Sequence, residues 1–168
     1  MNKHTLRLMR AGIIGALYVV LSLVTLPISG GAIQFRVSEG LTLLPLLYLE
    51  AVPALFIGCF LFNLLSGLAF YDVLIGSLVT LVAGLLTYLI GKVIKPKFFK
   101  ILVGGLFPVL LNALILPIVW IYLLGQSEVL YLITFVSLLI SQTLSVYTVG
   151  SAIYLPMAKY SNTVSFLQ

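Results

Sequence analysis

The chain has 168 residues, of which 62% are hydrophobic and 8% are charged, and its formal net charge is +5. A mean hydropathy of +1.25 excludes a water-soluble domain and predicts an integral membrane protein. With about 20 residues for each membrane-spanning helix, this length accommodates roughly six helices in one domain that covers residues 1–168.

Six apolar stretches are expected to form membrane-spanning helices. The stretch 40–71 is apolar except for Glu50, and Pro53 follows it closely. Because proline is tolerated at the start of a helix, this pattern predicts two helices with a tight turn at Glu50. The first of them, residues 40–49, is too short to cross a bilayer alone, so it begins earlier, near Val37, or is completed by the preceding loop. The other expected helices are residues 11–27, 73–91, 101–124 and 129–158.

Basic residues cluster at three places: the N-terminus, the connection between the fourth and fifth helices, and the C-terminus. With six crossings these places lie on one side of the membrane, and the positive-inside rule makes that side the cytoplasm. We therefore predict an all-α integral membrane protein with six transmembrane helices and cytoplasmic N- and C-termini. Arg36 falls on the opposite side. The residues that define the bias are Lys3, Arg7, Arg10, Lys92, Lys95, Lys97, Lys100 and Lys159.

A short segment before the second helix concentrates polar side chains in an otherwise apolar sequence. A charge costs on the order of 2.5–3.5 kcal/mol at the membrane midplane, so this cluster indicates ligand recognition. Glu39 is either a carboxylate favoured by the helix dipole or a buried acceptor for adjacent N–H donors of a ligand. Gln34 offers a donor and an acceptor that complement a heterocycle. Arg36 is solvated or bound to lipid phosphate, or it pairs with Glu39 or Asp72 and orders a loop over a cavity.

Further polar side chains lie in or next to the expected helices. Asp72 either caps the fourth helix or provides a negative charge for Arg36 or for a cationic ligand group. Asn63, Asn112 and Gln142 lie inside helices, where amides commonly form stabilising hydrogen bonds between helices. Asn112 and Gln142 are also candidates for contact with a ligand.

Three aromatic residues, Trp120, Tyr122 and Tyr131, lie near the expected outer ends of the fifth and sixth helices. Aromatic side chains commonly form a belt at the membrane–water interface, which is one interpretation. The alternative is that these rings stack on a planar ligand.

The first helix carries small residues four positions apart, Ala11 with Gly15 and Gly12 with Ala16. Small residues at this spacing make a smooth face that another helix can approach closely. The face either packs within the fold or docks to a separate membrane subunit.

The motifs of several protein classes are missing from the sequence. It has no P-loop, so ATP hydrolysis by that route is excluded. With one histidine, His4, and one cysteine, Cys59, we expect neither a metal site nor a catalytic dyad, and we predict that the chain is not an enzyme and has no cofactor. The basic residues are explained by the cytoplasmic membrane face, so we expect no nucleic-acid partner.

Taken together, these features resemble the substrate-binding S-components of energy-coupling factor (ECF) transporters. Within that group the chain is similar to the QueT family, the queuosine-precursor transporters. One departure concerns the first helix, where S-components often have alanine at both ends of the four-residue spacing and this chain has one glycine in each pair. The similarity rests on residues 33–39 (IQFRVSE), 41–45 (LTLLP), 56–59 (FIGC), 63–64 (NL) and 71–78 (YDVLIGSL).

The resemblance implies a role in uptake across the bacterial cell membrane. Such a protein captures a 7-deazaguanine, in the 7-aminomethyl or 7-cyano form or as queuine, on the outer face. It then docks to a transmembrane scaffold subunit driven by two ATPase subunits and releases the substrate inward. The docking residues would be Ala11, Gly12, Gly15 and Ala16.

For such a ligand, the resemblance suggests a role for each polar candidate. Glu39 would accept from the ring N–H and the amino group, and Gln34 or Asn112 would bind the carbonyl. Asp72 would attract an aminomethyl cation, and Arg36 would order the loop. The stacking candidates are Trp120, Tyr71 and Tyr131, and Gln142 completes the set of expected binding residues.

Three other functions stay open from the sequence. The chain is also consistent with an S-component for another vitamin or base, with a small transporter that works alone, and with a structural membrane protein that has no ligand. The lack of an internal repeat argues against a stand-alone transporter.

Overall fold

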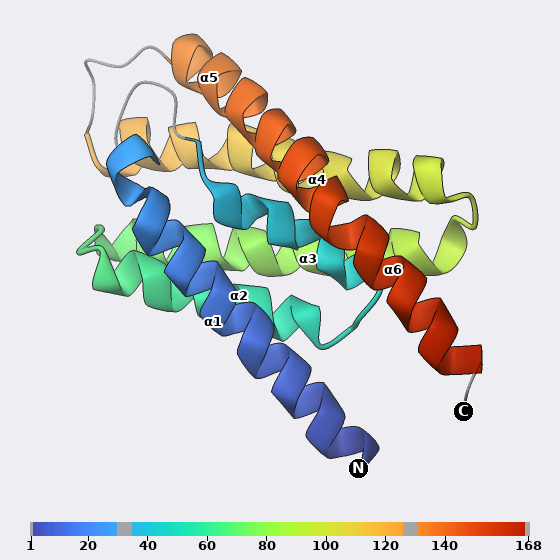
Figure 1. Cartoon of the computed structure of the whole chain (residues 1–168). Helices are drawn as coiled ribbons and strands as arrows, with labels where there is room; N and C mark the ends of the chain where they lie inside the picture. Colours follow the sequence, from blue (N-terminus) through green and yellow to red (C-terminus); the bar gives the residue numbers. More distant parts are fainter. Residues whose placement is uncertain (1, 30–34, 126–130, 167–168) are drawn as a thin grey trace.

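The computed structural model describes residues 2–29, 35–125 and 131–166, and within these ranges the chain is helical with no strand (Figure 1). Gln34 and Glu128 lie outside the described residues. The helical elements are α1 (Lys3–Ser29), η1 (Val37–Leu46), α2 (Ala51–Leu65), η2 (Asp72–Gly76), α3 (Ser77–Val93), α4 (Lys97–Ile118), η3 (Val119–Leu123), α5 (Tyr131–Leu144), η4 (Ser145–Gly150) and α6 (Ser151–Phe166).

Helical segments of two lengths build the structure. Four are long and apolar enough to cross a membrane, whereas η1 and α2 are apolar but shorter. The predicted all-α composition and the presence of helices that can span a membrane are confirmed. The number of membrane crossings stays a prediction. The four long segments are Lys3–Pro27, Asp72–Val93, Lys97–Leu123 and Tyr131–Lys159.

The boundaries around the second helix follow the expectation from sequence. The helix begins at Val37, the earlier of the possible starts, and ends at Leu46. Turn residues follow, and α2 begins at Ala51, directly after Glu50. Pro53 lies in the first turn of α2, where its missing N–H leaves no helical hydrogen bond unmade.

η1 is a 3₁₀ helix at the centre of the molecule. All residues from Ser38 to Leu46 are buried, and η1 contacts α1, α2, α3, α4, η4 and α6. A 3₁₀ helix rises about 2.0 Å per residue, so ten residues span roughly 20 Å instead of the roughly 15 Å of an α-helix. It is also narrower, which lets six other elements surround it.

Glycines allow this close approach to η1. A Cβ added at Gly40 would lie 2.8 Å from Cγ1 of Val149 and 2.9 Å from the backbone nitrogen of Gly150. A Cβ at Gly150 would lie 2.8 Å from the carbonyl oxygen of Gly40, and one at Gly91 would lie 2.8 Å from that of Leu46. Cβ atoms do not tolerate such distances, so η1 touches α3 and η4 backbone to backbone.

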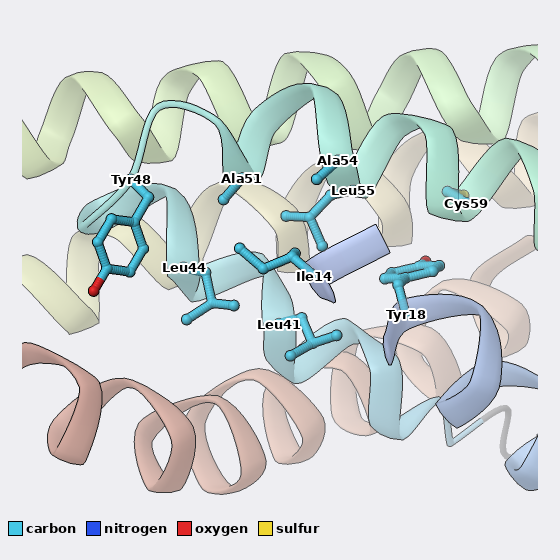
Figure 2. Close-up of a cluster of buried hydrophobic side chains, with 9 residues drawn as sticks. All are labelled: Ile14, Tyr18, Leu41, Leu44, Tyr48, Ala51, Ala54, Leu55 and Cys59. Carbon is cyan, nitrogen blue, oxygen red and sulfur yellow. The ribbon is translucent and has the colours of Figure 1, made fainter. Parts of the chain in front are cut away.

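A hydrophobic cluster joins α1, η1 and α2 (Figure 2). Lipid tails are as apolar as leucine, so close packing rather than exclusion of water stabilises such a cluster in a bilayer. Tyr18 is fully buried there and brings its hydroxyl into the interior. The cluster consists of Ile14, Tyr18, Leu41, Leu44, Tyr48, Ala51, Ala54, Leu55 and Cys59.

The two ends of the molecule differ in which segments they carry. The N-terminal start of α1, the C-terminal end of α6 and the α3–α4 connection lie at one end (Figure 1). The turn between α2 and η2 lies at the opposite end. The three basic clusters of the sequence therefore share one end, as the charge pattern requires.

We expect Gly40→Ala to destabilise the fold by about 1–3 kcal/mol, because the added methyl group overpacks the contact with Gly150. Thermal unfolding in detergent measures the effect. The matched control is Gly12→Ala, since a Cβ at Gly12 meets no atom within 4 Å. Equal melting temperatures for the two variants would contradict the close approach.

Candidate functional site

A cavity of about 170 Å³ lies between η1, α2, η2, α3, α4 and η3. Leu68, in the turn between α2 and η2, contributes to its wall, so the cavity lies toward the end of the molecule opposite the termini (Figure 1). Its lining includes five residues expected from the sequence, namely Arg36, Glu39, Asp72, Asn112 and Trp120. The remaining lining residues are Cys59, Asn63, Leu68, Gly76, Thr80 and Leu116.

Glu39 is the buried carboxylate of this cavity, with 2% of its surface exposed. The Tyr18 hydroxyl donates a hydrogen bond to Oε1 at 2.7 Å, and the Asn112 amide donates one to Oε2 at 3.3 Å. An ionised carboxylate can accept about four hydrogen bonds, so each oxygen keeps a lone pair for a further donor. Glu39 is therefore held in place by the protein and still able to accept from a ligand.

Asp72 and Trp120 form a second polar contact, with the Trp120 indole N–H donating to Oδ1 of Asp72 at 2.7 Å. Both residues lie in π-helical turns, η2 and η3. Pro117 lacks an amide hydrogen and interrupts the α-helical ladder just before η3. Such wider turns occur frequently at functional sites, where they reorient side chains.

The cap interpretation of Asp72 is wrong, because the helix already begins at Phe70 and Asp72 lies inside it. One of the two alternatives for Arg36 was an ion pair with Glu39 or Asp72. Among the described residues it forms no direct salt bridge with either, although its positive charge is close enough to attract both carboxylates. Its guanidinium lies 5.8 Å from the centre of the Phe62 ring, and its carbonyl oxygen accepts a hydrogen bond from the Ser145 hydroxyl. Arg36 is thus held by an aromatic ring and by its backbone.

Asn63 is a cavity residue that the sequence pointed to only as a contact between helices. Its amide nitrogen donates to the Asp72 carbonyl oxygen at 3.4 Å and to the Cys59 sulfur at 3.5 Å. Its Oδ1 is buried and has no hydrogen-bond partner among the described residues. Leaving a buried acceptor unpaired costs free energy, which a ligand donor would recover. The sequence feature that could have assigned Asn63 to the cavity is its four-residue spacing from Cys59, which puts both residues on one face of α2.

Three other expected binding residues lie outside the lining of the cavity. Tyr71 is 49% exposed and makes an edge contact with Phe70. Tyr131 stacks on Phe135 and donates to the carbonyl oxygen of Leu114 at 3.2 Å. Gln142 is buried and does not line this cavity, and its Oε1 is unpaired among the described residues. Gln34 is not among the residues that the structure describes.

Comparison with known proteins identifies the family, because the model of the QueT transporter family matches residues 8–159. The chain belongs to the QueT family. Over 100 residues it is 36% identical to the queuosine precursor transporter QueT of Lactococcus lactis subsp. cremoris, a match that covers 58% of this chain and 59% of that protein. No solved structure matches the chain. Together with its long apolar helices, the family identifies a multi-pass protein of the bacterial plasma membrane.

In this QueT-family chain the two small-residue pairs of α1 face different directions. A Cβ at Gly15 would lie 3.2 Å from the carbonyl oxygen of Ala54, and Ala11 packs against the hydrophobic cluster. Gly12 and Ala16 are exposed. The pair Ala11 and Gly15 thus packs within the fold, and the pair Gly12 and Ala16 faces outward.

We expect Tyr18→Phe to lower the free energy of unfolding by about 1.5–3 kcal/mol, because Glu39 loses a hydrogen bond inside the protein. The melting temperature in detergent should fall by about 2–4 °C for each kcal/mol. Tyr154→Phe is the control for loss of a tyrosine hydroxyl, since the Tyr154 ring is also largely buried and its hydroxyl forms no hydrogen bond with the described residues. An equal shift in both variants would argue against a structural role for the Tyr18–Glu39 bond.

Proposed function

We propose that this protein binds a queuosine precursor of the 7-deazaguanine class in the cavity of Glu39, as the substrate-binding S-component of an ECF importer. The observation that carries the proposal is the pairing of two buried acceptors, the Glu39 carboxylate and the unpaired Oδ1 of Asn63, in one small cavity. Family membership supports the proposal. The relative from Lactococcus lactis is a queuosine precursor transporter, and the match covers 59% of its length.

The hydrogen-bonding groups of the cavity complement this ligand. A 7-deazaguanine presents a ring N–H beside an amino group, and the free lone pairs of Glu39 accept from that edge. Asn112 donates one amide hydrogen to Glu39 and has a second for the ligand carbonyl. Asp72 provides negative charge for an aminomethyl group, and Trp120 provides a ring for stacking. Gln34 stays a proposed partner of the heterocycle.

The size of the cavity favours a small form of the base. A cavity of about 150 Å³ holds a benzene ring, so about 170 Å³ suits one small planar molecule. The 7-cyano and 7-aminomethyl bases are compact. The additional ring of queuine would extend out of the cavity toward the exposed end of the site.

The direction of uptake follows from the charge pattern. The basic clusters share the end that carries both termini, and the positive-inside rule assigns that end to the cytoplasm. The cavity lies toward the opposite end and would face outside. In the six crossings that we propose, η1 and α2 are the short ones. η1 is buried among the other helices, whereas α2 keeps an exposed apolar face that includes Ile57 and Leu64.

A partner module is proposed to supply the energy. The chain has no P-loop, so nucleotide hydrolysis would fall to two ATPase subunits acting through a transmembrane scaffold. α1 is the least buried of the four long helices, because only 22% of its most apolar 18-residue stretch is buried inside the fold. Its outward pair, Gly12 and Ala16, is the proposed contact for the scaffold, in place of the full set of four small residues.

We expect Glu39→Gln to weaken binding of 7-aminomethyl-7-deazaguanine by about 10- to 100-fold, because a charge-assisted hydrogen bond becomes a neutral one and an amide hydrogen faces the ligand donors. Titration followed by the fluorescence of Trp120, the one tryptophan, measures the affinity. Glu50→Gln, which changes a glutamate outside this cavity, is the matched control. Unchanged affinity in Glu39→Gln would contradict the proposed role.

We expect Gly12→Leu and Ala16→Leu to reduce uptake into liposomes with the partner module by about tenfold or more, while substrate binding stays intact, because bulk on this face blocks close helix approach. Ala152→Leu, at an exposed small residue of α6, controls for added bulk alone. Uptake at the wild-type rate in both α1 variants would exclude this face as the docking surface. Uptake without any ATPase partner would instead support a transporter that works alone.

A further inference from the structure

A second hollow lies at the end of the molecule that carries the termini. This groove has a volume of about 870 Å³ and lies between the start of α1, the turn before α2 and the end of α3. Leu46, the last residue of η1, contributes to it, whereas Glu39 near the start of η1 lines the substrate cavity. The two hollows therefore lie toward opposite ends of the central helix, and the groove takes no part in the proposed substrate site.

The rim of the groove carries more positive than negative charge. Arg7 and Arg10 lie three residues apart on one face of α1, and Lys92 lies at the end of α3. Arg10 is neutralised by Glu50 at 3.5 Å and lies 4.6 Å from the centre of the Tyr48 ring. Arg7 and Lys92 have no carboxylate partner among the described residues, so the rim can bind an anion.

The floor of the groove is apolar. Leu47, Leu81 and Leu85 line the groove and make up what we call its floor. Leu81 and Leu85 precede Lys92 on α3, so they lie further from the end of that helix than the cation does. A free inorganic anion gains nothing from leucine side chains, whereas an amphiphile places its acidic group at the rim and its hydrocarbon on the floor. Basic pockets between helices on the cytoplasmic side of membrane proteins bind anionic lipid headgroups in this way.

We propose that this groove is a binding site for an anionic phospholipid. The phosphate lies between Arg7 and Lys92, and one acyl chain lies along Leu81 and Leu85. The positive-inside bias predicts that this end faces the anionic cytoplasmic leaflet, where such lipids are available. Bound there, the lipid joins the start of α1 to the end of α3 at the end remote from the substrate cavity.

The test compares lipid binding to the purified full-length protein by native mass spectrometry. We expect phosphatidylglycerol to bind about tenfold more tightly than phosphatidylcholine with the same acyl chains. Each cation accounts for roughly a fivefold change in affinity, so Arg7→Gln with Lys92→Gln should weaken phosphatidylglycerol binding roughly 25-fold. Lys97→Gln with Lys100→Gln, at the same end but outside the groove, is the matched control and should change it little.

Three outcomes would overturn the proposal. Equal binding of the two lipids by the wild-type protein would remove the charge requirement, and this comparison needs no substitution. Equal loss in the two double variants would indicate a diffuse basic surface instead of a site. Competition by glycerol 3-phosphate at the concentration of the lipid would show that the groove binds a free anion and that the leucine floor is not used.

Discussion

A carboxylate buried among apolar helices needs hydrogen-bond donors that the protein itself provides, and this requirement shapes the centre of the molecule. Glu39 receives one donor from Tyr18 of α1 and one from Asn112 of α4. These residues are 21 positions before and 73 positions after Glu39 in the sequence. The contact therefore joins α1, η1 and α4, and Glu39 and Asn112 also line the candidate cavity.

The narrow 3₁₀ helix that carries Glu39 makes this arrangement possible. Gly40 and Gly150 let η4 approach it backbone to backbone, and Gly91 does the same for α3. The π turns beside it bring Asp72 and Trp120 into contact across the cavity. α1 directs Tyr18 toward Glu39 and keeps Gly12 and Ala16 on its outer face. Under the proposed function, the helix that contacts the scaffold therefore also donates a hydrogen bond to the carboxylate that would bind the substrate.

Much of the lining of the candidate cavity could be predicted, because polar residues are rare enough in this chain to be informative. Arg36, Glu39, Asp72, Asn112 and Trp120 all line one cavity. The aromatic candidates were harder to assign, because the sequence pattern of a tyrosine at a membrane interface is the same whether its ring stacks on a ligand or on a neighbouring side chain. Tyr131 stacks on Phe135, and Tyr71 is exposed. Asn63 was assigned to helix contacts because sequence does not show which amide oxygen is left without a partner.

Composition, hydropathy and the positions of the basic residues were sufficient to predict the all-α membrane fold, because the bilayer selects apolar helices by length and sorts cations by side. The five segments between residues 33 and 78, together with the general features of the chain, were sufficient to predict the family. Tertiary structure alone decided which small-residue pair of α1 faces outward, that Arg36 pairs with no carboxylate of the described chain, and that Asn63 keeps an unpaired acceptor in the cavity. Those outcomes depend on the rotation of each helix about its axis and on neighbours far away in the chain, which packing determines and local sequence does not.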